Sequence, residues 1–116
     1  MTKSDNIVPM TLSSDHALRV IRELAADSSK IVITGHASAR AKKRYVTHLQ
    51  IEKCLQKGTI TEGPFLNAYG HWQVSMYRHA AGEELTCAVA IEWAQKLVVV
   101  TVFPPKARPA ESRKRR

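Results

Sequence analysis

A histidine and three basic residues recur at helical spacing in the first half of the chain. His36, Arg40 and Arg44 stand four residues apart, and Lys43 lies seven residues from His36. On an α-helix all four side chains would fall within about a third of the circumference. Paired arginine N–H groups can clamp a phosphate, and an imidazole can transfer a proton near neutral pH. The spacing therefore predicts a phosphate site, and a solvated basic helix is the alternative that the residues alone leave open.

Cleavage of a phosphodiester without a metal needs a base, an acid and cations that stabilise the pentacoordinate phosphate. His36 is the candidate acid or base, and Arg40 and Arg44 are the candidate phosphate clamp. Thr101, in a late apolar strand, could hold a phosphate oxygen. Two further side chains would add positive charge to the same helix: Lys42 and Lys43.

A second polar surface is predicted on a strand. The segment HWQVSMYRH, residues 71–79, alternates, so that His71, Gln73, Ser75, Tyr77 and His79 share one face and apolar residues take the other. We expect Tyr77 and His79 to contact nucleic acid together with the two lysines. The alternative is a sheet face that is merely exposed to solvent, and it is favoured for His71.

The cysteines and carboxylates predict no metal site and no cofactor. Cys54 and Cys87 have neither each other nor a histidine at ligand spacing, and they lie within apolar patterns. They are typical of buried thiols in a reducing compartment. No glycine-rich phosphate loop is present, so nucleotide hydrolysis is not expected.

The elements that must position these residues follow from changes in periodicity. Helical spacing gives way to alternation near residue 59, which predicts an α+β fold: N-terminal helices packed on one face of an antiparallel three- to four-stranded meander sheet. The third helix should begin at a Thr47–Gln50 capping box, bury Leu49 or Ile51, and end at Gly58 in a left-handed stop. The expected helices are 13–27, 34–44 and 47–58, and the expected strands are 71–79, 83–93 and 96–103. Residues 30–34 are expected to form a strand or an extended lead-in, and residues 59–65 a strand or an irregular edge.

Charge and composition predict one domain with a basic tail. The formal net charge is +8, and residues 104–116 hold six basic residues against one glutamate, which leaves +3 for the rest. We expect a flexible N-terminus over 1–12, a single domain over 13–103 and a disordered basic tail over 104–116. The longest apolar run is far shorter than a membrane span, and the N-terminus lacks a signal-peptide core, so a cytoplasmic protein without a membrane partner is expected.

The stretch ITGHASARAKKRYVTHLQIEKCLQKGTITE and the final VVVTVF resemble a family of small bacterial domains of unknown function. That family carries the pattern H-A-x-x-R-x-x-x-R, which His36, Ala37, Arg40 and Arg44 match. Lys43 stands where the family often has an acidic residue. A lysine in place of an acid strengthens the attraction of this helix for phosphate. The likeness covers about residues 31–103, and the later positions that match are Leu55, Gly58, Ile60 and Thr101.

The family is related in fold to the BrnT and RelE toxins, in a grouping that also includes barnase-like and EndoU-like ribonucleases. The resemblance therefore implies a RelE-like fold and a toxin-like, metal-independent endoribonuclease or RNA-binding domain of a toxin–antitoxin type system. The implied partners are RNA, including ribosome-associated RNA, and an acidic antitoxin-like protein. A non-catalytic nucleic-acid-binding or protein-interaction module that uses the same basic helix is the alternative.

Overall fold

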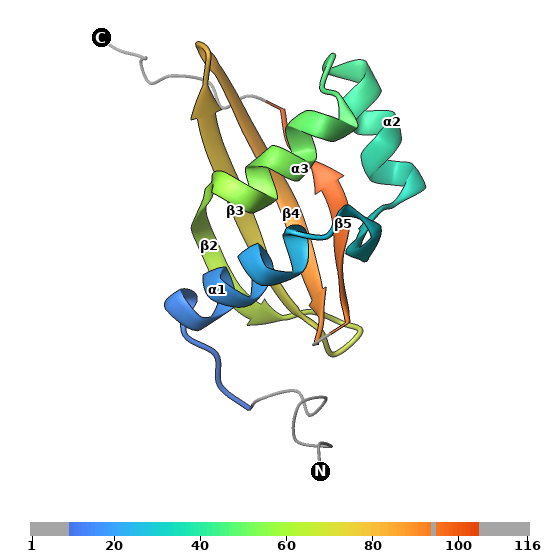
Figure 1. Ribbon diagram of the computed structural model, residues 1–116. Coiled ribbons are helices and arrows are strands. Elements are labelled where there is room, and N and C mark those ends of the chain that lie inside the picture. Colours follow the sequence, from blue (N-terminus) through green and yellow to red (C-terminus); the bar gives the residue numbers. More distant parts are fainter. Residues whose placement is uncertain (1–9, 94, 105–116) are drawn as a thin grey trace, which may run out of the picture.

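The structure is a computed structural model that describes residues 10–93 and 95–104 (Figure 1). In this part of the chain three α-helices precede most of a five-stranded sheet. Residues 1–9 of the predicted flexible N-terminus (1–12) and residues 105–116 of the predicted basic tail (104–116) lie outside the described residues. The elements are α1 (Ser14–Ala25), the 3₁₀ turn η2 (Ser28–Lys30), β1 (Ile31–Ile33), α2 (Gly35–Lys43), α3 (His48–Lys57), β2 (Thr59–Leu66), β3 (Trp72–Ala80), β4 (Glu83–Glu92) and β5 (Lys96–Val102).

Capping side chains fix where the helices begin. The Ser13 hydroxyl accepts a hydrogen bond from the His16 N–H at 3.1 Å, at the start of α1. At the start of α3 the Gln50 N–H donates to the Thr47 hydroxyl at 3.0 Å, and the Thr47 N–H donates to the Gln50 side-chain oxygen at 2.8 Å. These bonds satisfy N–H groups that have no partner inside the helix. The predicted capping box is confirmed.

The end of α3 corrects one prediction. Gly58 has φ −80° and ψ −173°, which is extended backbone, so the predicted left-handed stop is wrong. Glycine is needed there for space, because a Cβ atom would lie 2.5 Å from the carbonyl oxygens of Cys54 and Tyr77. The Arg22 guanidinium also donates to the Gly58 carbonyl at 2.9 Å. The residue thus joins α1, α3 and β3 at one close contact.

The sheet has the order β1-β5-β4-β3-β2. Strands β2 to β5 form the predicted antiparallel meander, with irregular register in β2. The predicted count of three to four strands and the purely antiparallel pattern are wrong, because β1 adds a fifth strand parallel to β5. Ile31 pairs with Leu97 and Ile33 with Val99, so this three-residue strand covers part of the apolar edge of β5. The sheet is therefore mixed, and the α+β class is confirmed.

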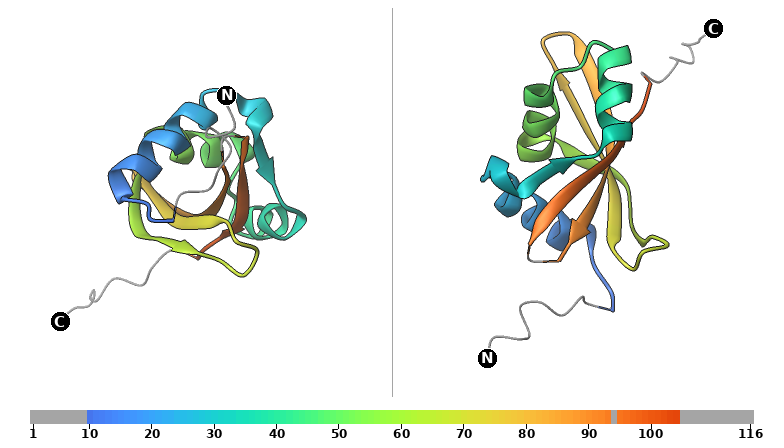
Figure 2. Two further views of the ribbon diagram at one scale, coloured as in Figure 1. Left: turned by 90° about the horizontal axis from the view of Figure 1, so that it is seen from below. Right: turned by 90° about the vertical axis from the view of Figure 1, so that its right-hand side faces the viewer.

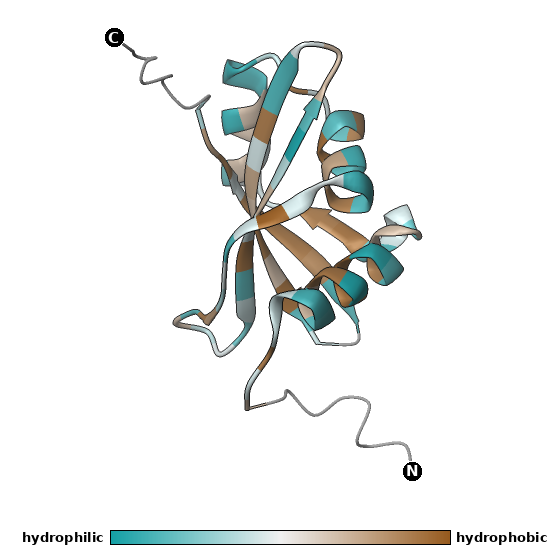
Figure 3. Cartoon of the chain, turned by 90° about the vertical axis from the view of Figure 1, so that its left-hand side faces the viewer, coloured by the Kyte–Doolittle hydropathy of each residue, from teal (hydrophilic) through white to brown (hydrophobic). Residues whose placement is uncertain are grey.

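The hydrophobic core lies between the sheet and the two helices α1 and α3, which cover one side of it (Figure 2). We call this side the inner face and the opposite side the outer face. Hydrophobic strand residues gather beneath the helices, whose outward sides are hydrophilic (Figure 3). Of the two predicted alternatives in α3, Ile51 is buried and Leu49 is 63% exposed. The largest fully buried side chains include Ile21, Ile51, Leu55, Met76, Ile91 and Leu97.

Both cysteines are buried free thiols, as predicted. The Cys54 Sγ donates to the Leu85 carbonyl at 3.9 Å. A hydrogen bond to Cys54, together with burial, raises the pKa of the Cys87 thiol well above its usual value. Both thiols belong to the core contact between α3 and β4. Within residues 10–93 and 95–104, no helix combines the length and apolar character needed to span a bilayer.

Candidate functional site

One threonine positions the basic helix α2 on the sheet. The Thr34 hydroxyl accepts a hydrogen bond from the Ala37 N–H at 3.0 Å and donates to the Val100 carbonyl at 3.3 Å. The Thr34 N–H donates to the Val99 carbonyl at 3.2 Å. Thr34 therefore ends the pairing of β1 with β5, caps α2 and ties the start of the helix to β5.

Two alanines set which side of α2 is buried. Ala37 and Ala41 are 0% and 1% exposed and belong to the hydrophobic core. Their small side chains let the helix lie close against the edge of the sheet at β5, past the end of β1 (Figure 1). Because α2 is buried along this stripe, its charged side chains point away from the core.

These charged side chains surround an open hollow on the surface of α2. It is lined by His36, Ala39, Arg40, Lys42 and Lys43, and all five residues are exposed. No side chain among the four charged or titratable residues has a hydrogen bond or ion pair within the described residues. The structure thus lines this hollow with three cations and a histidine, which have no carboxylate partner in residues 10–93 and 95–104.

Arg44 lies apart from this hollow. It caps the end of α2, where its Nη1 donates to the Arg40 carbonyl at 3.4 Å. Its side chain is half-buried, and its Nε has no hydrogen-bond partner among the residues that the structure describes. The predicted clamp of two arginines therefore separates into Arg40, which lines the hollow with the lysines, and Arg44, which lies at the helix end.

A hydrogen bond between helices shows which way Arg40 faces. The Ser38 hydroxyl and the His48 Nε2 are 3.1 Å apart, so Ser38 faces α3, which lies on the inner face. Arg40 lies about 160° away from Ser38 around the helix axis. Arg40 is therefore on the flank of α2 toward the outer face of the sheet. The Ser38–His48 pair was not predicted as a site, because contact between the two helices leaves no signal in residue spacing.

The other predicted site residues lie on the outer face. Tyr77 and His79 alternate with the buried inner-face residues of β3, as expected. Tyr77 is half-buried, and His79 is exposed and pairs with Glu84. Thr101 is half-buried and pairs with Ala88, next to the extra residue Val100 that bulges β5. None of these residues lines the α2 hollow, so the structure divides the prediction into a basic helix surface and a neighbouring sheet surface.

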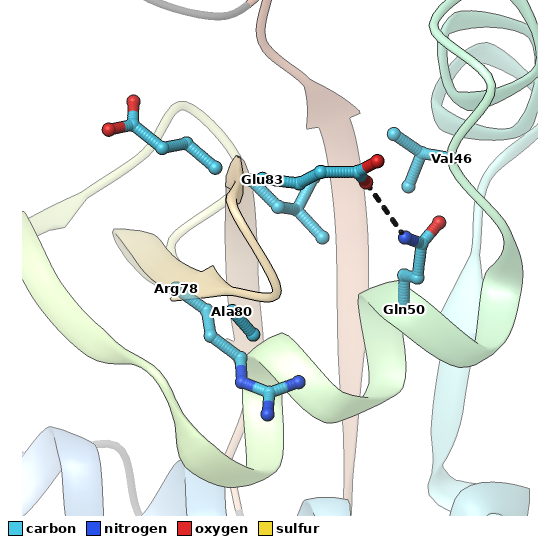
Figure 4. A pocket seen from close by; sticks show the side chains of 7 residues that line it. Val46, Gln50, Arg78, Ala80 and Glu83 are labelled. Carbon is cyan, nitrogen blue, oxygen red and sulfur yellow. Dashed lines mark hydrogen bonds between the residues drawn. The ribbon is translucent and has the colours of Figure 1, made fainter.

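A second pocket of about 50 Å³ lies between α3 and the β3–β4 hairpin (Figure 4). Gln50 donates to Glu83 across it at 3.4 Å. One arginine and two glutamates line this pocket, so its charge is mixed and it offers an anion little attraction. Its lining residues are Val46, Gln50, Arg78, Ala80, Glu83, Glu84 and Leu85.

A family model described as "Domain of unknown function (DUF4258)" matches residues 33–104. The matched segment runs from the end of β1, through α2 and α3, to just beyond β5. It therefore contains the α2 hollow and most of the outer face. Comparison with curated proteins and with solved structures finds no match to this chain.

Proposed function

Since the chain belongs to the DUF4258 family of domains of unknown function, whose name assigns no activity, we propose a function from the site itself: the domain binds RNA through the cations of α2. The α2 hollow carries this proposal, because Arg40, Lys42 and Lys43 line it and have no acidic partner among the described residues. Like charges so close together destabilise a helix slightly, and a bound phosphate removes that repulsion. The resemblance to RelE- and BrnT-like toxins supports RNA as the source of the phosphate.

The first test is salt dependence. Binding of a fluorescently labelled oligouridine to the full chain should weaken as salt rises, because each phosphate contact releases a condensed counterion. With about three phosphates contacted, the slope of log K against log salt is about −2, which corresponds to roughly a 15-fold loss between 50 and 200 mM. Anisotropy titrations measure this slope. An affinity that stays constant over this range, or no binding at low salt, contradicts the proposal.

Cleavage is the second candidate function, and the position of His36 inside the cationic hollow favours it. The 2′-oxygen would attack phosphorus as the bond to the 5′-oxygen breaks, which gives a 2′,3′-cyclic phosphate and a 5′-hydroxyl. His36 would accept the 2′-hydroxyl proton, and water would protonate the leaving oxygen. Arg40 would stabilise the charge on the pentacoordinate phosphate. Thr101 and Arg44, predicted to assist, lie outside the hollow, so we assign them to neighbouring RNA contacts.

Cleavage by the wild-type chain should therefore proceed in EDTA and yield 2′,3′-cyclic ends, which mass spectrometry identifies. His36→Gln should lower the rate by at least about tenfold, because it removes the proton-transfer group. His48→Gln is the matched control, since His48 is also exposed but lies on the Ser38 side of α2. Binding without any cleavage would leave the domain as a non-catalytic RNA-binding module.

The same cations could instead contact an acidic antitoxin-like protein, as the resemblance implies. Such a protein would compete with RNA for α2. Displacement of labelled RNA by an acidic peptide, at equal ionic strength, measures this second use of the surface.

A further inference from the structure

The outer face of β3 and β4 has a floor of small side chains at its centre. No helix of the described chain covers this face, because α1 and α3 lie on the inner side and α2 lies beside β5 (Figure 2). Ser75, Ala88 and Ala90 occupy neighbouring positions at its centre and are 9%, 3% and 3% exposed. Because these small side chains are almost fully buried, the longer side chains around them form the accessible surface of this face.

Aromatic rings border this floor. Phe65 pairs with Gln73, which pairs with Ala90, so all three share one row across the outer face, and Phe65 is 49% exposed. In the row formed by Tyr77 and Thr86, the N–H of Phe103 donates to the Thr86 carbonyl at 2.9 Å. Phe103 follows the inward-facing Val102 and is 40% exposed.

The distances between these rings would allow each ring to contact a different unstacked base. Residues two apart on a strand are about 6.8 Å apart, and neighbouring strands are about 4.8 Å apart. Phe65 and Tyr77 are therefore offset by about 13 Å along the strands, and Phe103 lies about 10 Å from Tyr77 across the sheet. Aromatic rings on a sheet can each accept one unstacked base of a single strand, whereas the bases of a duplex are turned inward.

Charge places the RNA backbone on one side of this face. Arg40 lies on the flank of α2 toward the outer face, and Thr101 stands on β5 between α2 and the floor. At the opposite edge, Glu62 accepts a hydrogen bond from the Ser75 hydroxyl at 3.4 Å. Phosphates are attracted to the α2 side and repelled from the β2 side, so the bases extend across the floor.

From these observations we propose that the RNA bound by α2 is single-stranded and that its bases stack on Phe65, Tyr77 and Phe103 across the outer face. This inference rests on the proposed RNA binding and adds the substrate class and the base contacts. The rings supply affinity that does not depend on salt, and the cations supply the part that does.

The test compares a 12-nucleotide oligouridine with a 12-base-pair RNA duplex, each titrated with the full chain at the same salt concentration. Phe65→Ala and Phe103→Ala should each weaken single-strand binding by about fivefold or more and leave duplex binding unchanged. The salt slope should stay at its wild-type value, because the phosphate contacts remain. Leu49→Ala is the control: it removes an exposed apolar side chain from α3, on the inner side of the sheet.

Phe65→Leu and Phe103→Leu keep the apolar contacts and remove the ring, so they test the same claim if an alanine variant folds poorly. If these variants bind single-stranded RNA as tightly as the wild type does, and binding still depends on salt, this inference is overturned and the proposed function stands. Equal wild-type affinity for both RNAs, at equal phosphate number, also overturns it. If the wild type binds neither RNA, both proposals fail.

Discussion

Reversing two charges in the α2 hollow, as Arg40→Glu with Lys43→Glu, is expected to weaken RNA binding by about 100-fold at moderate salt. Both side chains are exposed and line the hollow without an acidic partner, so the change breaks no ion pair in the described structure. It removes two attractive charges and adds two repulsive ones. At about 0.7 kcal/mol for each of these four changes near a phosphate, the total is about 2.8 kcal/mol. Anisotropy titration of labelled oligouridine measures the loss.

The matched control is Arg19→Glu with Lys57→Glu. These exposed residues lie on α1 and α3, and the double variant has the same net charge as the α2 variant. Its affinity should change by less than about threefold, and its salt slope should stay at the wild-type value. The α2 variant should lose about 1.4 from the slope, because two single-strand phosphate contacts are removed. If both variants lose affinity equally, binding follows the net charge of the protein and not the α2 hollow.

The second large effect is on stability. Gly58→Ala is expected to lower the free energy of unfolding by about 3 kcal/mol, because its Cβ would lie 2.5 Å from two carbonyl oxygens. Both oxygens belong to backbone, one at the end of α3 and one in β3, so neither can move without shifting an element. Relief of the clash would also disturb the bond from Arg22 to the Gly58 carbonyl. Urea unfolding followed by circular dichroism measures the change.

Gly35→Ala is the control for this substitution. Gly35 is the first residue of α2, and a Cβ atom there would meet nothing within 4 Å. The change should leave stability unaltered or raise it by up to about 1 kcal/mol, because alanine has less conformational freedom to lose in the unfolded chain. A Gly58→Ala variant as stable as Gly35→Ala would show that α3 and β3 are not held together at this point.

Local signals predicted most of the elements, because capping and alternation act over a few residues. Thr47 and Gln50 mark the start of α3 by their own hydrogen bonds, and the alternation of β3 separates its buried and exposed faces. The partner of β1 could not be predicted in this way. No turn connects β1 directly to β5 in the sequence, so the pairing of these two strands depends on how the whole chain packs. The role of Gly58 was missed for the same reason, since one of the two carbonyls that restrict it comes from β3.

The part of the candidate site that lies on a single helix could be predicted from the sequence. The spacing of His36, Arg40 and Lys43 placed them on one side of α2, because helix geometry alone decides it. Spacing did not predict that Arg44 would cap the helix end, or that Phe65 would share a sheet face with Ala90. These relations depend on a local fold of the backbone at residue 44 and on strand register. The periodicity of a single segment predicts neither of them.

The bond from the Thr34 hydroxyl to the Val100 carbonyl connects the start of α2 to the edge of the sheet. Displacing α2 would break its first turn and the last β1–β5 hydrogen bond together, so the helix cannot detach as an independent unit. Any molecule that binds α2 in its packed position must, by mass action, also disfavour fraying of β5. An anion that binds α2 is therefore expected to raise the amide protection of β5, a strand that it would not contact.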